Sequence, residues 1–345
     1  MRGAAPILAV GAIVLLFAGG SQAGSRAKIR WQQFVHLQGV VDLAGPRADG
    51  RFVVTGAGGL FLLTRGGALT PFARGANGYV PARGEAYIAL AHARKLARSN
   101  CSFHRDDVYA LDPVDHPGVT LVDRLGRARR FVDLPAGSFL STIAFDNVGR
   151  FGYRLLVTAQ VSGRTTVYAI DCRGRTTVVL RGAPKVEGGS AVAPAGFGPF
   201  GGRLIAADET SGSIYAFGAG GGIRLVARPR IPAGGDTGVE SVGFVPPRFA
   251  RGRAAYLADL GAPGSPTTGS DSILRLTGSR LVGAGVRSDD LLTAAEASGV
   301  TVVVHCKQRC TARTIGRALD ATHAEGHIVF SATNPSRRGA RAGPR

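Results

Sequence analysis

The sequence predicts an all-β fold, a β-propeller of about six blades with four antiparallel strands in each; a ring of about seven blades is the alternative. One observation is a phrase made of a short apolar strand, a glycine turn and a second short strand, which recurs roughly every 50 residues. Its copies begin at Leu60, Val119, Val167, Ile214 and Ile273. The other observation is composition, because 51 glycines and 18 prolines among 345 residues favour many turns and short strands.

The repeats divide the chain into consecutive blades, expected at 38–73, 85–134, 140–181, 187–227, 240–282 and 289–331. In the clearest blade, strands are expected at 190–193, 203–207, 213–217 and 222–227. The next blade should have strands at 241–245, 254–258, 272–276 and 280–282. The last should have strands at 291–295, 300–305, 311–317 and 327–331, although 311–319 also fits a helix.

The N-terminal segment predicts that the protein is exported. Arg2, an uncharged apolar run over 4–20 and the small residues up to Ala23 form the pattern of a secretory signal peptide at 1–23. An uncleaved membrane anchor is the alternative, because the run has about the minimum length of a transmembrane helix. We expect a lead-in at 24–35, a single propeller domain at 36–331 and a disordered basic tail at 332–345. The mature protein would be a soluble, secreted monomer without stable membrane insertion, free or associated with the cell wall.

The net charge of +19 raises the question of nucleic-acid binding. All but four of the 42 basic residues are arginines, and they are scattered through the turns. Nucleic-acid binding needs a clustered basic patch, and single-stranded targets need aromatic platforms between the basic residues. We therefore expect no specific nucleic-acid partner, and only non-specific attraction to anionic polymers outside the cell.

Four cysteines in an exported chain predict two disulfides. We favour Cys306 with Cys310, in a tight loop after the strand that ends at His305, and Cys101 with Cys172, between loops of neighbouring blades. The other pairings stay open at this point. A zinc site at His305, Cys306 and Cys310 is a further alternative, but a closed tetrahedral site needs a fourth ligand.

Polar residues open the first strands of several blades, where propeller geometry brings them to one mouth of the central channel. They are Gln38, Glu85, Glu187 and Glu240. Converging carboxylates raise one another's pKa unless a positive charge lies between them. A hard cation, Ca²⁺, would meet this need, with Glu187 and Glu240 facing each other as ligands and Gln38 or Glu85 nearby. Alternatively, the glutamates accept backbone N–H bonds from the neighbouring blade, or an arginine supplies the opposite charge.

A second group of polar residues is His323, Glu325 and His327. Alternate residues of a strand point to one face, so these three would share a face. Two imidazoles and a carboxylate could bind a transition metal or serve as acid–base groups; an exposed polar segment is the alternative. Asp208 and Asp259 end second strands and are expected to cap turns. The sequence contains no nucleophile elbow, Walker A loop or EF-hand loop.

The stretch 202–208, Gly-Arg-Leu-Ile-Ala-Ala-Asp, and the stretch 212–216, Gly-Ser-Ile-Tyr-Ala, carry a resemblance. Together with the other blades, over roughly residues 38–285, they resemble the six-bladed propellers of the senescence-marker/gluconolactonase superfamily. The resemblance implies a divalent cation held by acidic and amide side chains at the channel mouth, and hydrolysis of lactones or esters. Glu187, Glu240 and Gln38 match that type of ligand.

These observations leave two hypotheses of function. The first is an exported binding or scaffold propeller, which uses its polar channel mouth or its loops to bind a small molecule, a wall polymer or a protein. The alternative is a divalent-metal-dependent hydrolase that acts on a lactone or an ester.

Overall fold

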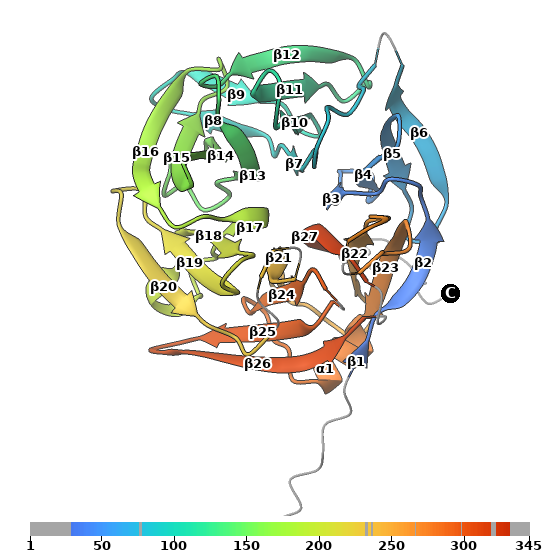
Figure 1. Cartoon of the computed structure of the whole chain (residues 1–345). Helices are drawn as coiled ribbons and strands as arrows, with labels where there is room; N and C mark the ends of the chain where they lie inside the picture. The colour runs from blue at the N-terminus through green and yellow to red at the C-terminus, as the bar shows by residue number, and fades with distance from the viewer. Residues whose placement is uncertain are drawn as a thin grey trace, which may run out of the picture.

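A computed structural model describes residues 29–75, 78–231, 234–235, 237–265, 267–297, 299–318 and 322–331. Its strands form a ring around a central axis, and the colours of Figure 1 follow the chain around that ring. The structure is a β-propeller, as the repeats predicted. The expected signal peptide and basic tail lie outside the described residues. Within the described ranges, no helix has the length and apolar character that a membrane crossing requires.

Four separate sheets of four antiparallel strands make up the first part of the ring. The first contains β3 (Asp42–Ala44), β4 (Phe52–Gly56), β5 (Gly59–Leu63) and β6 (Leu69–Arg74). The second contains β7 (Ile88–Leu90), β10 (Val108–Asp112), β11 (Gly118–Val122) and β12 (Ala128–Asp133). The third contains β13 (Phe139–Phe145), β14 (Leu155–Val161), β15 (Arg164–Ile170) and β16 (Thr176–Ala183). The fourth contains β17 (Glu187–Val192), β18 (Leu204–Asp208), β19 (Ser213–Phe217) and β20 (Ile223–Ala227).

Apart from a separate two-stranded hairpin, the remaining strands form one nine-stranded sheet, which divides into two groups of four and one added strand. The fifth group contains β21 (Val239–Phe244), β24 (Leu291–Ala295), β25 (Thr301–Cys306) and β26 (Cys310–Arg317). The sixth contains β27 (Ala324–Phe330), β22 (Ala254–Asp259), β23 (Ser272–Thr277) and β2 (Gln32–His36). The two groups meet at a single parallel pair, Val242 with His327, and β1 (Ile29–Arg30) runs parallel to β26.

The order of strands in these two groups corrects the sequence-based division into blades. The strands expected at 254–258 and 272–276 do not continue the group that begins with β21; they pair with β27 and β2. The fourth strand expected in that blade, at 280–282, does not form, and its residues lie in a short helix, α1 (Gly278–Gly283). The segment 311–317 is a strand and not a helix. A linear reading of repeats fails here because the chain leaves the fifth group after its first strand and returns for the other three.

Both ends of the described chain close the ring. β27 is the innermost strand of the sixth group and β2 is its outermost strand, so strands from opposite ends of the sequence share one sheet. The expected lead-in at 24–35 therefore contains sheet strands. Trp31 sits between β1 and β2, is 1% exposed, and donates from its indole Nε1 to Thr301 Oγ1 at 2.8 Å.

The hydrophobic core is distributed between neighbouring groups of strands. Between the second and third groups, Phe103 and Tyr109 pack edge-on against Phe145, with ring centroids 4.9 and 5.3 Å from it. Phe131 adds a further edge contact to Tyr109. Because each such cluster is shared by two groups, packing holds the groups in a fixed order around the axis.

Two disulfides are present, and they are the favoured pairings. Cys101 is bonded to Cys172, and Cys306 is bonded to Cys310. Cys101 lies in the hairpin of β8 (Arg94–Leu96) and β9 (Cys101–Phe103), which interrupts the second group and is joined by this bond to the third. Beside the bond, Ser99 Oγ donates to the Asp171 carboxylate at 2.7 Å. The alternative zinc site is excluded in this state, because both of its sulfurs are in the disulfide.

The two bonds should differ in their contribution to stability. Cys101 and Cys172 are 71 residues apart in sequence, whereas Cys306 and Cys310 are 4 apart. Loop-closure entropy gives about 4 kcal/mol for the long loop and about 2 kcal/mol for the short one. We expect the double variant Cys101→Ser/Cys172→Ser to lose more free energy of unfolding than Cys306→Ser/Cys310→Ser. Denaturant titrations of both measure the difference, and equal losses would contradict the cross-group role of the first bond.

Candidate functional site

The innermost strands of the six groups surround the axis (Figure 1). Acidic side chains gather where several of these strands begin. Tyr87, which directly precedes β7, is fully buried at the centre of this gathering. Its hydroxyl lies 2.5 Å from Glu85 Oε2, 2.8 Å from Glu240 Oε1 and 2.8 Å from Glu325 Oε2. These three carboxylates come from the second, fifth and sixth groups, and sequence analysis had selected all three.

The single hydroxyl of Tyr87 cannot satisfy all three carboxylates. A phenol hydroxyl donates one hydrogen bond, so it satisfies one carboxylate and can only accept from the other two. Those two must carry protons, or a cation must share the space with them. Glu240 is 2% exposed and Glu325 is fully buried, so water cannot solvate a negative charge on either side chain.

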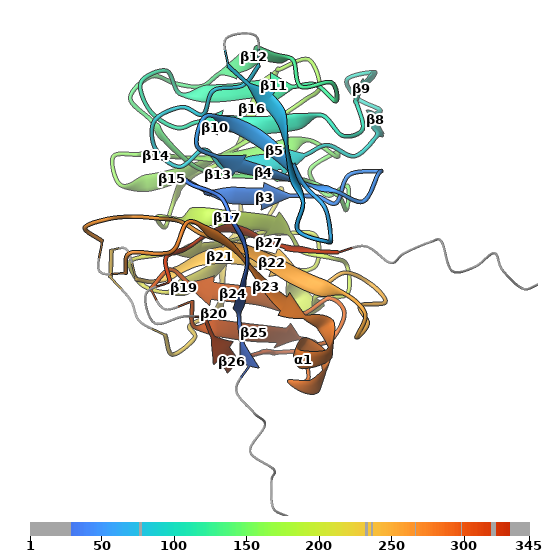
Figure 2. The same cartoon turned by 90° about the vertical axis from the view of Figure 1, so that its right-hand side faces the viewer.

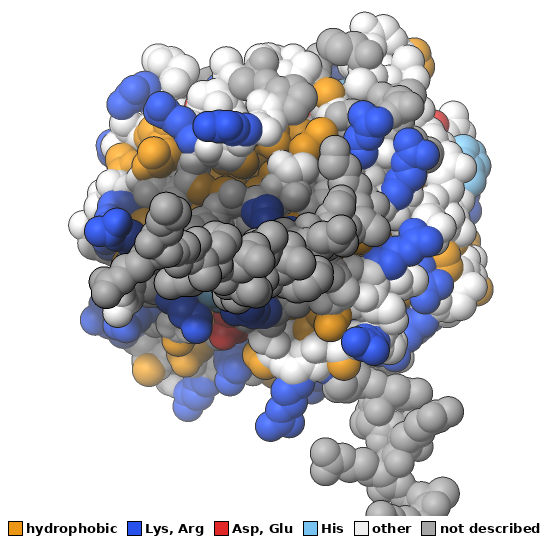
Figure 3. All heavy atoms as spheres, turned by 90° about the horizontal axis from the view of Figure 1, so that it is seen from below, with side chains coloured by type: hydrophobic (Ala, Val, Ile, Leu, Met, Phe, Trp, Pro, Cys, Tyr) orange, Lys and Arg blue, Asp and Glu red, His pale blue; other side chains and the backbone are white. Residues whose placement is uncertain are grey.

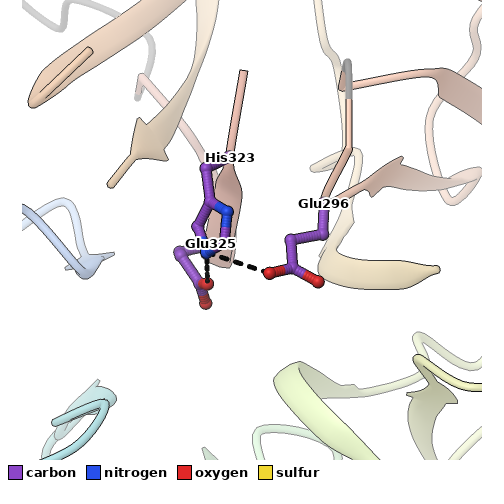
Figure 4. Close-up of side chains that lie close together, drawn as sticks. All are labelled: Glu296, His323 and Glu325. Carbon is purple, nitrogen blue, oxygen red and sulfur yellow. Dashed lines mark ion pairs between the residues drawn. The ribbon is translucent and has the colours of Figure 1, made fainter. Parts of the chain in front are cut away.

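A second set of contacts adjoins the first through Glu325. His323 Nε2 lies 2.9 Å from Glu296 Oε1 and 3.2 Å from Glu325 Oε1, and Figure 4 shows the imidazole facing both carboxylates. His323 Nδ1 lies 3.1 Å from the carbonyl oxygen of Thr267. Both ring nitrogens therefore face acceptors, which indicates a protonated imidazolium. Within the described part of the chain, the buried Glu296 Oε2 has no hydrogen-bond donor.

The environment shifts the pKa values of these groups strongly. Burial, together with repulsion from the neighbouring carboxylates, raises the pKa values of Glu240 and Glu325 well above their usual range. Burial also raises the pKa of Glu85 to about 7, against a lowering effect of its hydrogen bond with Tyr87. Burial alone would lower the pKa of His323, but hydrogen bonds to Glu296 and Glu325 raise it to about 10. The site thus holds more acid groups than its own cations can balance.

His327 does not share the site of His323 and Glu325, which corrects the expectation of a common face. Glu325 pairs with Ala258 and Val329 with Tyr256, so β27 contains a bulge between them that ends the alternation. His327 instead places Nδ1 2.8 Å from Asp42 Oδ2 and Nε2 3.0 Å from the carbonyl of Ile143. Burial opposes the charge, but Asp42 raises the pKa of His327 overall. His327 is therefore part of an ion pair further along the channel.

The bulge depends on Gly326, which has φ of +64°. A Cβ there would lie 2.3 Å from Asp42 Oδ1, the atom that accepts the backbone N–H of His327 at 2.7 Å. We expect Gly326→Ala to lower the free energy of unfolding by about 2–4 kcal/mol, from backbone strain and displacement of Asp42.

Gly252→Ala is the matched control for this variant, because Gly252 is exposed and a Cβ there would meet nothing within 4 Å. It should change stability by less than about 1 kcal/mol. Thermal and denaturant unfolding of both variants make the comparison. Equal effects would show that the bulge does not require glycine.

Glu187 and Gln38 lie apart from the group around Tyr87. Glu187 Oε2 lies 3.1 Å from Lys185 Nζ, which also lies 3.7 Å from Glu209 Oε2. Glu187 interacts electrostatically with Glu240, but it does not face it in a shared ligand group. Gln38 is exposed in a turn whose carbonyl accepts from Ala57. Glu240 therefore lies with Glu85 and Glu325, and not with Glu187 as the sequence predicted.

Asp208 and Asp259 both hold backbone near strand ends. Asp208 accepts from the amides of Thr210 and Ser211 at 3.0 and 3.3 Å, so it caps a turn as expected. Asp259 accepts the amide of His323 at 2.8 Å and contacts the Ser270 hydroxyl. Asp259 thus fixes the position of His323 in addition to holding a loop.

Two residues of the site escaped sequence analysis. Tyr87 stands two positions after Glu85, and its hydroxyl contacts carboxylates from three groups of strands. In the sequence, an aromatic residue next to an apolar strand looks like an ordinary core residue. Glu296 follows β24, a strand that was assigned to the wrong blade. Its backbone N–H donates to Gly238 and its carbonyl accepts from Ala324, which brings it beside His323.

Among the described residues, two overlapping sets of side chains have ligand atoms close enough to hold a metal ion. One consists of Glu85, Glu240 and Glu325, and the other of Glu296, His323 and Glu325; within each, the ligand atoms lie within 4.8 Å of one another. The fold and these buried carboxylates together define a β-propeller with an acidic central channel.

No family model and no curated protein matches the sequence. Among solved structures, a streptogramin B lyase is similar, with a TM-score of 0.47 and 11% identity, over 83% of this chain and 72% of that chain. The virginiamycin B lyase from Staphylococcus aureus has a TM-score of 0.47 and 12% identity, over 88% of this chain and 95% of that one. A protein assigned as a gluconolactonase has a TM-score of 0.35 and 12% identity, over 72% and 91%. The similarities concern the fold, which the sheet order described above establishes independently.

Proposed function

We propose that this chain is an exported binding propeller whose acidic channel mouth holds one divalent cation. The observation that carries the proposal is the Tyr87 hydroxyl within 2.8 Å of three carboxylate oxygens, because one donor cannot satisfy three acceptors. Glu296 Oε2, buried and without a hydrogen-bond donor among the described residues, adds a second demand for positive charge.

The donor set favours a hard cation. Glu85, Glu240 and Glu325 offer oxygen atoms only, as Ca²⁺ prefers, with water or backbone oxygens completing the shell. The imidazole of His323 has both nitrogens directed at acceptors, so it acts as a neighbouring cation and not as a ligand. The side chains that would hold the ion are therefore Glu85, Glu240 and Glu325, with Tyr87 at their centre.

Metal analysis and calorimetry test the proposal. The purified protein, stripped with a chelator and dialysed, is titrated with Ca²⁺, Mg²⁺ and Zn²⁺, and the bound metal is measured by elemental analysis. We expect about one Ca²⁺ per chain, and a rise of melting temperature by about 5 °C at a hundredfold excess over Kd. No bound ion and an unchanged melting temperature would leave protons as the neutralising charge and contradict the proposal.

A metal-dependent hydrolase of lactones or esters is the second candidate, and one observation favours it. In this candidate Glu240 and Glu325 hold the ion, and Glu85 does not. Glu85 is only half-buried, and its pKa, which burial raises to about 7, suits a general acid–base group at neutral pH. Lactones and simple esters, assayed with and without Ca²⁺, test this candidate. Activity that is lost in Glu85→Gln while Ca²⁺ still binds would favour the enzyme over the binding protein.

Export and partners follow from separate features. Two disulfides favour an oxidising compartment. In the face shown in Figure 3, basic side chains are spread over the described surface and do not gather into one stripe. This distribution favours weak attraction to anionic wall polymers over specific nucleic-acid binding. Elution of the protein from cell walls by moderate salt would test the association.

A further inference from the structure

A small surface pocket lies in the outer part of the fifth group, apart from the channel. Its volume is about 170 Å³, and its wall is formed by the hairpin of β25 and β26 and by the loop that joins α1 to β24. Of the four strands of this group, β26 is the outermost. The side view shows β25, β26 and α1 together at one end of the molecule (Figure 2). The pocket shares no residue with the carboxylate group around Tyr87.

The hairpin turns one face toward the pocket. Val303 pairs with Arg313 and His305 pairs with Thr311, and all four residues line the pocket. Residues that lie opposite each other in a sheet, or two positions apart in one strand, share a face. The next pair of residues is joined by the short disulfide. This bond therefore closes the hairpin one position beyond His305 and Thr311 and holds their register.

One buried carboxylate arranges the two walls of the pocket. Asp290 is 2% exposed; one of its oxygens lies 2.6 Å from His305 Nδ1, and the other accepts the backbone N–H of Arg287 at 2.8 Å. Both oxygens are thus occupied. The carboxylate of Asp289, the preceding residue, lies beside Gly196 and not in the pocket wall. An anion in the pocket would therefore meet no unoccupied carboxylate of the lining residues.

Positive and polar groups of the pocket remain available to a ligand. Within the described chain, the guanidinium of Arg287 has no hydrogen-bond or ion-pair partner, and that of Arg313 donates to the carbonyl of Ala284 at 2.6 Å. The side chain of His305 is 34% exposed, and its Nε2 has no partner among the described residues. This nitrogen donates to an anionic oxygen when the ring is charged and accepts from a protonated oxygen when it is neutral. Thr311, opposite His305, is exposed and adds a hydroxyl.

We propose that this pocket binds a phosphate group, either of the free ion or of an anionic polymer. Guanidinium groups bind phosphate through charged, paired hydrogen bonds, and Arg287 and Arg313 belong to the two different walls. A tetrahedral group presents oxygens to both walls at once, whereas a planar carboxylate presents two oxygens in one direction. Since a water molecule takes about 30 Å³ of liquid, the pocket has room for about six waters, which suits the five non-hydrogen atoms of a phosphate.

A second pocket adjoins the first across Arg313, which lines both. Its wall includes Arg228 and Arg230, which follow β20. A linear polymer of phosphates bound in the first pocket would continue toward these arginines. The polymer form of the ligand rests on the proposed export, and it gives the proposed attraction to wall polymers a defined point of contact. The pocket itself depends neither on export nor on the cation at the channel mouth.

Three probes test the chemistry of the ligand: inorganic phosphate, acetate and a short linear polyphosphate. The full-length protein, stripped of metal and dialysed, is titrated at moderate salt, and binding is followed by calorimetry and phosphorus NMR. We expect phosphate to bind at least about tenfold more tightly than acetate. Tighter binding of polyphosphate would support the site with a polymer as the ligand, and equal affinity would support it with the free ion. Acetate as tight as phosphate, or no binding of either phosphate probe, would overturn the proposal.

Two variants of Arg287 locate the binding. Arg287→Ala should weaken both phosphate probes about tenfold, because it removes a charged donor group. The folded protein should tolerate this change, since the side chain has no partner among the described residues. Arg287→Lys keeps the charge but loses the planar fork of donors, so it should weaken both probes about threefold.

Arg309→Ala is the matched control. Arg309 is an exposed arginine of the same hairpin, and it does not line the pocket, so its loss removes the same charge from the protein without touching the site. It should change neither affinity by more than about twofold, because salt screens distant exposed charges. Equal losses in Arg287→Ala and Arg309→Ala would mean that overall positive charge attracts phosphate, and would overturn the proposed site. The response to Ca²⁺, measured on the same variants, should stay unchanged, so failure of the phosphate site and failure of the cation site give different results.

Discussion

Glu240→Gln is expected to raise the melting temperature of the metal-free protein by about 2–6 °C and to remove most of its response to Ca²⁺. The side chain is 2% exposed, and burial and repulsion from Glu325 and Glu85 raise its pKa well above the usual range. A neutral amide of the same shape needs neither a buried charge nor a proton taken up on folding at neutral pH, and removing this cost is worth about 1–2 kcal/mol. The same change removes a ligand from the proposed cation site. The variant should thus be more stable than wild type in chelator and less stable in excess Ca²⁺.

Glu187→Gln is the matched control for this reversal. Glu187 is paired with Lys185 at 3.1 Å and lies outside the group around Tyr87. Its neutralisation should bring no gain in chelator and should keep the response to Ca²⁺. Melting curves of the wild type and both variants, in chelator and in excess Ca²⁺, measure all the effects. Loss of the response in Glu187→Gln, with retention in Glu240→Gln, would restore the pair expected from sequence and refute the ligand set drawn from the structure.

The sequence was sufficient to predict the propeller because each group of strands carries its own local signal. An apolar strand, a glycine turn and a second strand form a hairpin wherever they occur, as in β18 and β19. The pairing of Cys101 with Cys172 could also be predicted, since both fall in loops of neighbouring groups. These features depend on residues close in sequence or on the repeat itself.

The arrangement of the last two groups could not be predicted in the same way. Strands β22 and β23 look like the continuation of β21. Nothing in their apolar pattern shows that β22 pairs with β27, near the other end of the described chain, and β23 with β2, near its start. The choice is made by non-local pairing, such as Ala258 with Glu325 and Ile273 with Val35. Assigning the strands in chain order therefore misplaced them.

The site was predicted in part for a related reason. Glu85 and Glu240 were found because they precede or open first strands, and Glu325 because a polar triplet is conspicuous beside an apolar strand. The expectation that His323, Glu325 and His327 point to one face failed at Gly326. Its positive φ belongs to a bulge that the sequence alone does not reveal. Tyr87 was missed because its role comes from three carboxylates that only the closed ring brings to its hydroxyl.

Trp31→Ala is expected to lower the free energy of unfolding by about 3–5 kcal/mol, the usual range for removal of a buried large aromatic side chain. Trp31 lies between β1, which pairs with the fifth group, and β2, which completes the sixth. It is 1% exposed, and its backbone N–H donates to Arg317 at 3.3 Å while its indole donates to Thr301. Its loss should therefore weaken the seam where the two ends of the chain close the ring.

Trp31→Phe separates the packing of this residue from its hydrogen bond. It keeps most of the apolar area and should cost about 1–2 kcal/mol, chiefly from the hydrogen bond that Thr301 Oγ1 no longer accepts. The Thr301 hydroxyl would still donate to the carbonyl of Gly299, at 2.9 Å. Trp31 is the only tryptophan of the sequence, so its fluorescence in the wild type reports on the seam alone. Because β2 and β27 belong to one sheet, release of either opens the ring, and fluorescence and far-UV circular dichroism should follow the same unfolding transition. A fluorescence change well before the dichroism change, with Trp31→Ala as stable as wild type, would mean that the remaining strands hold the ring together without this closure.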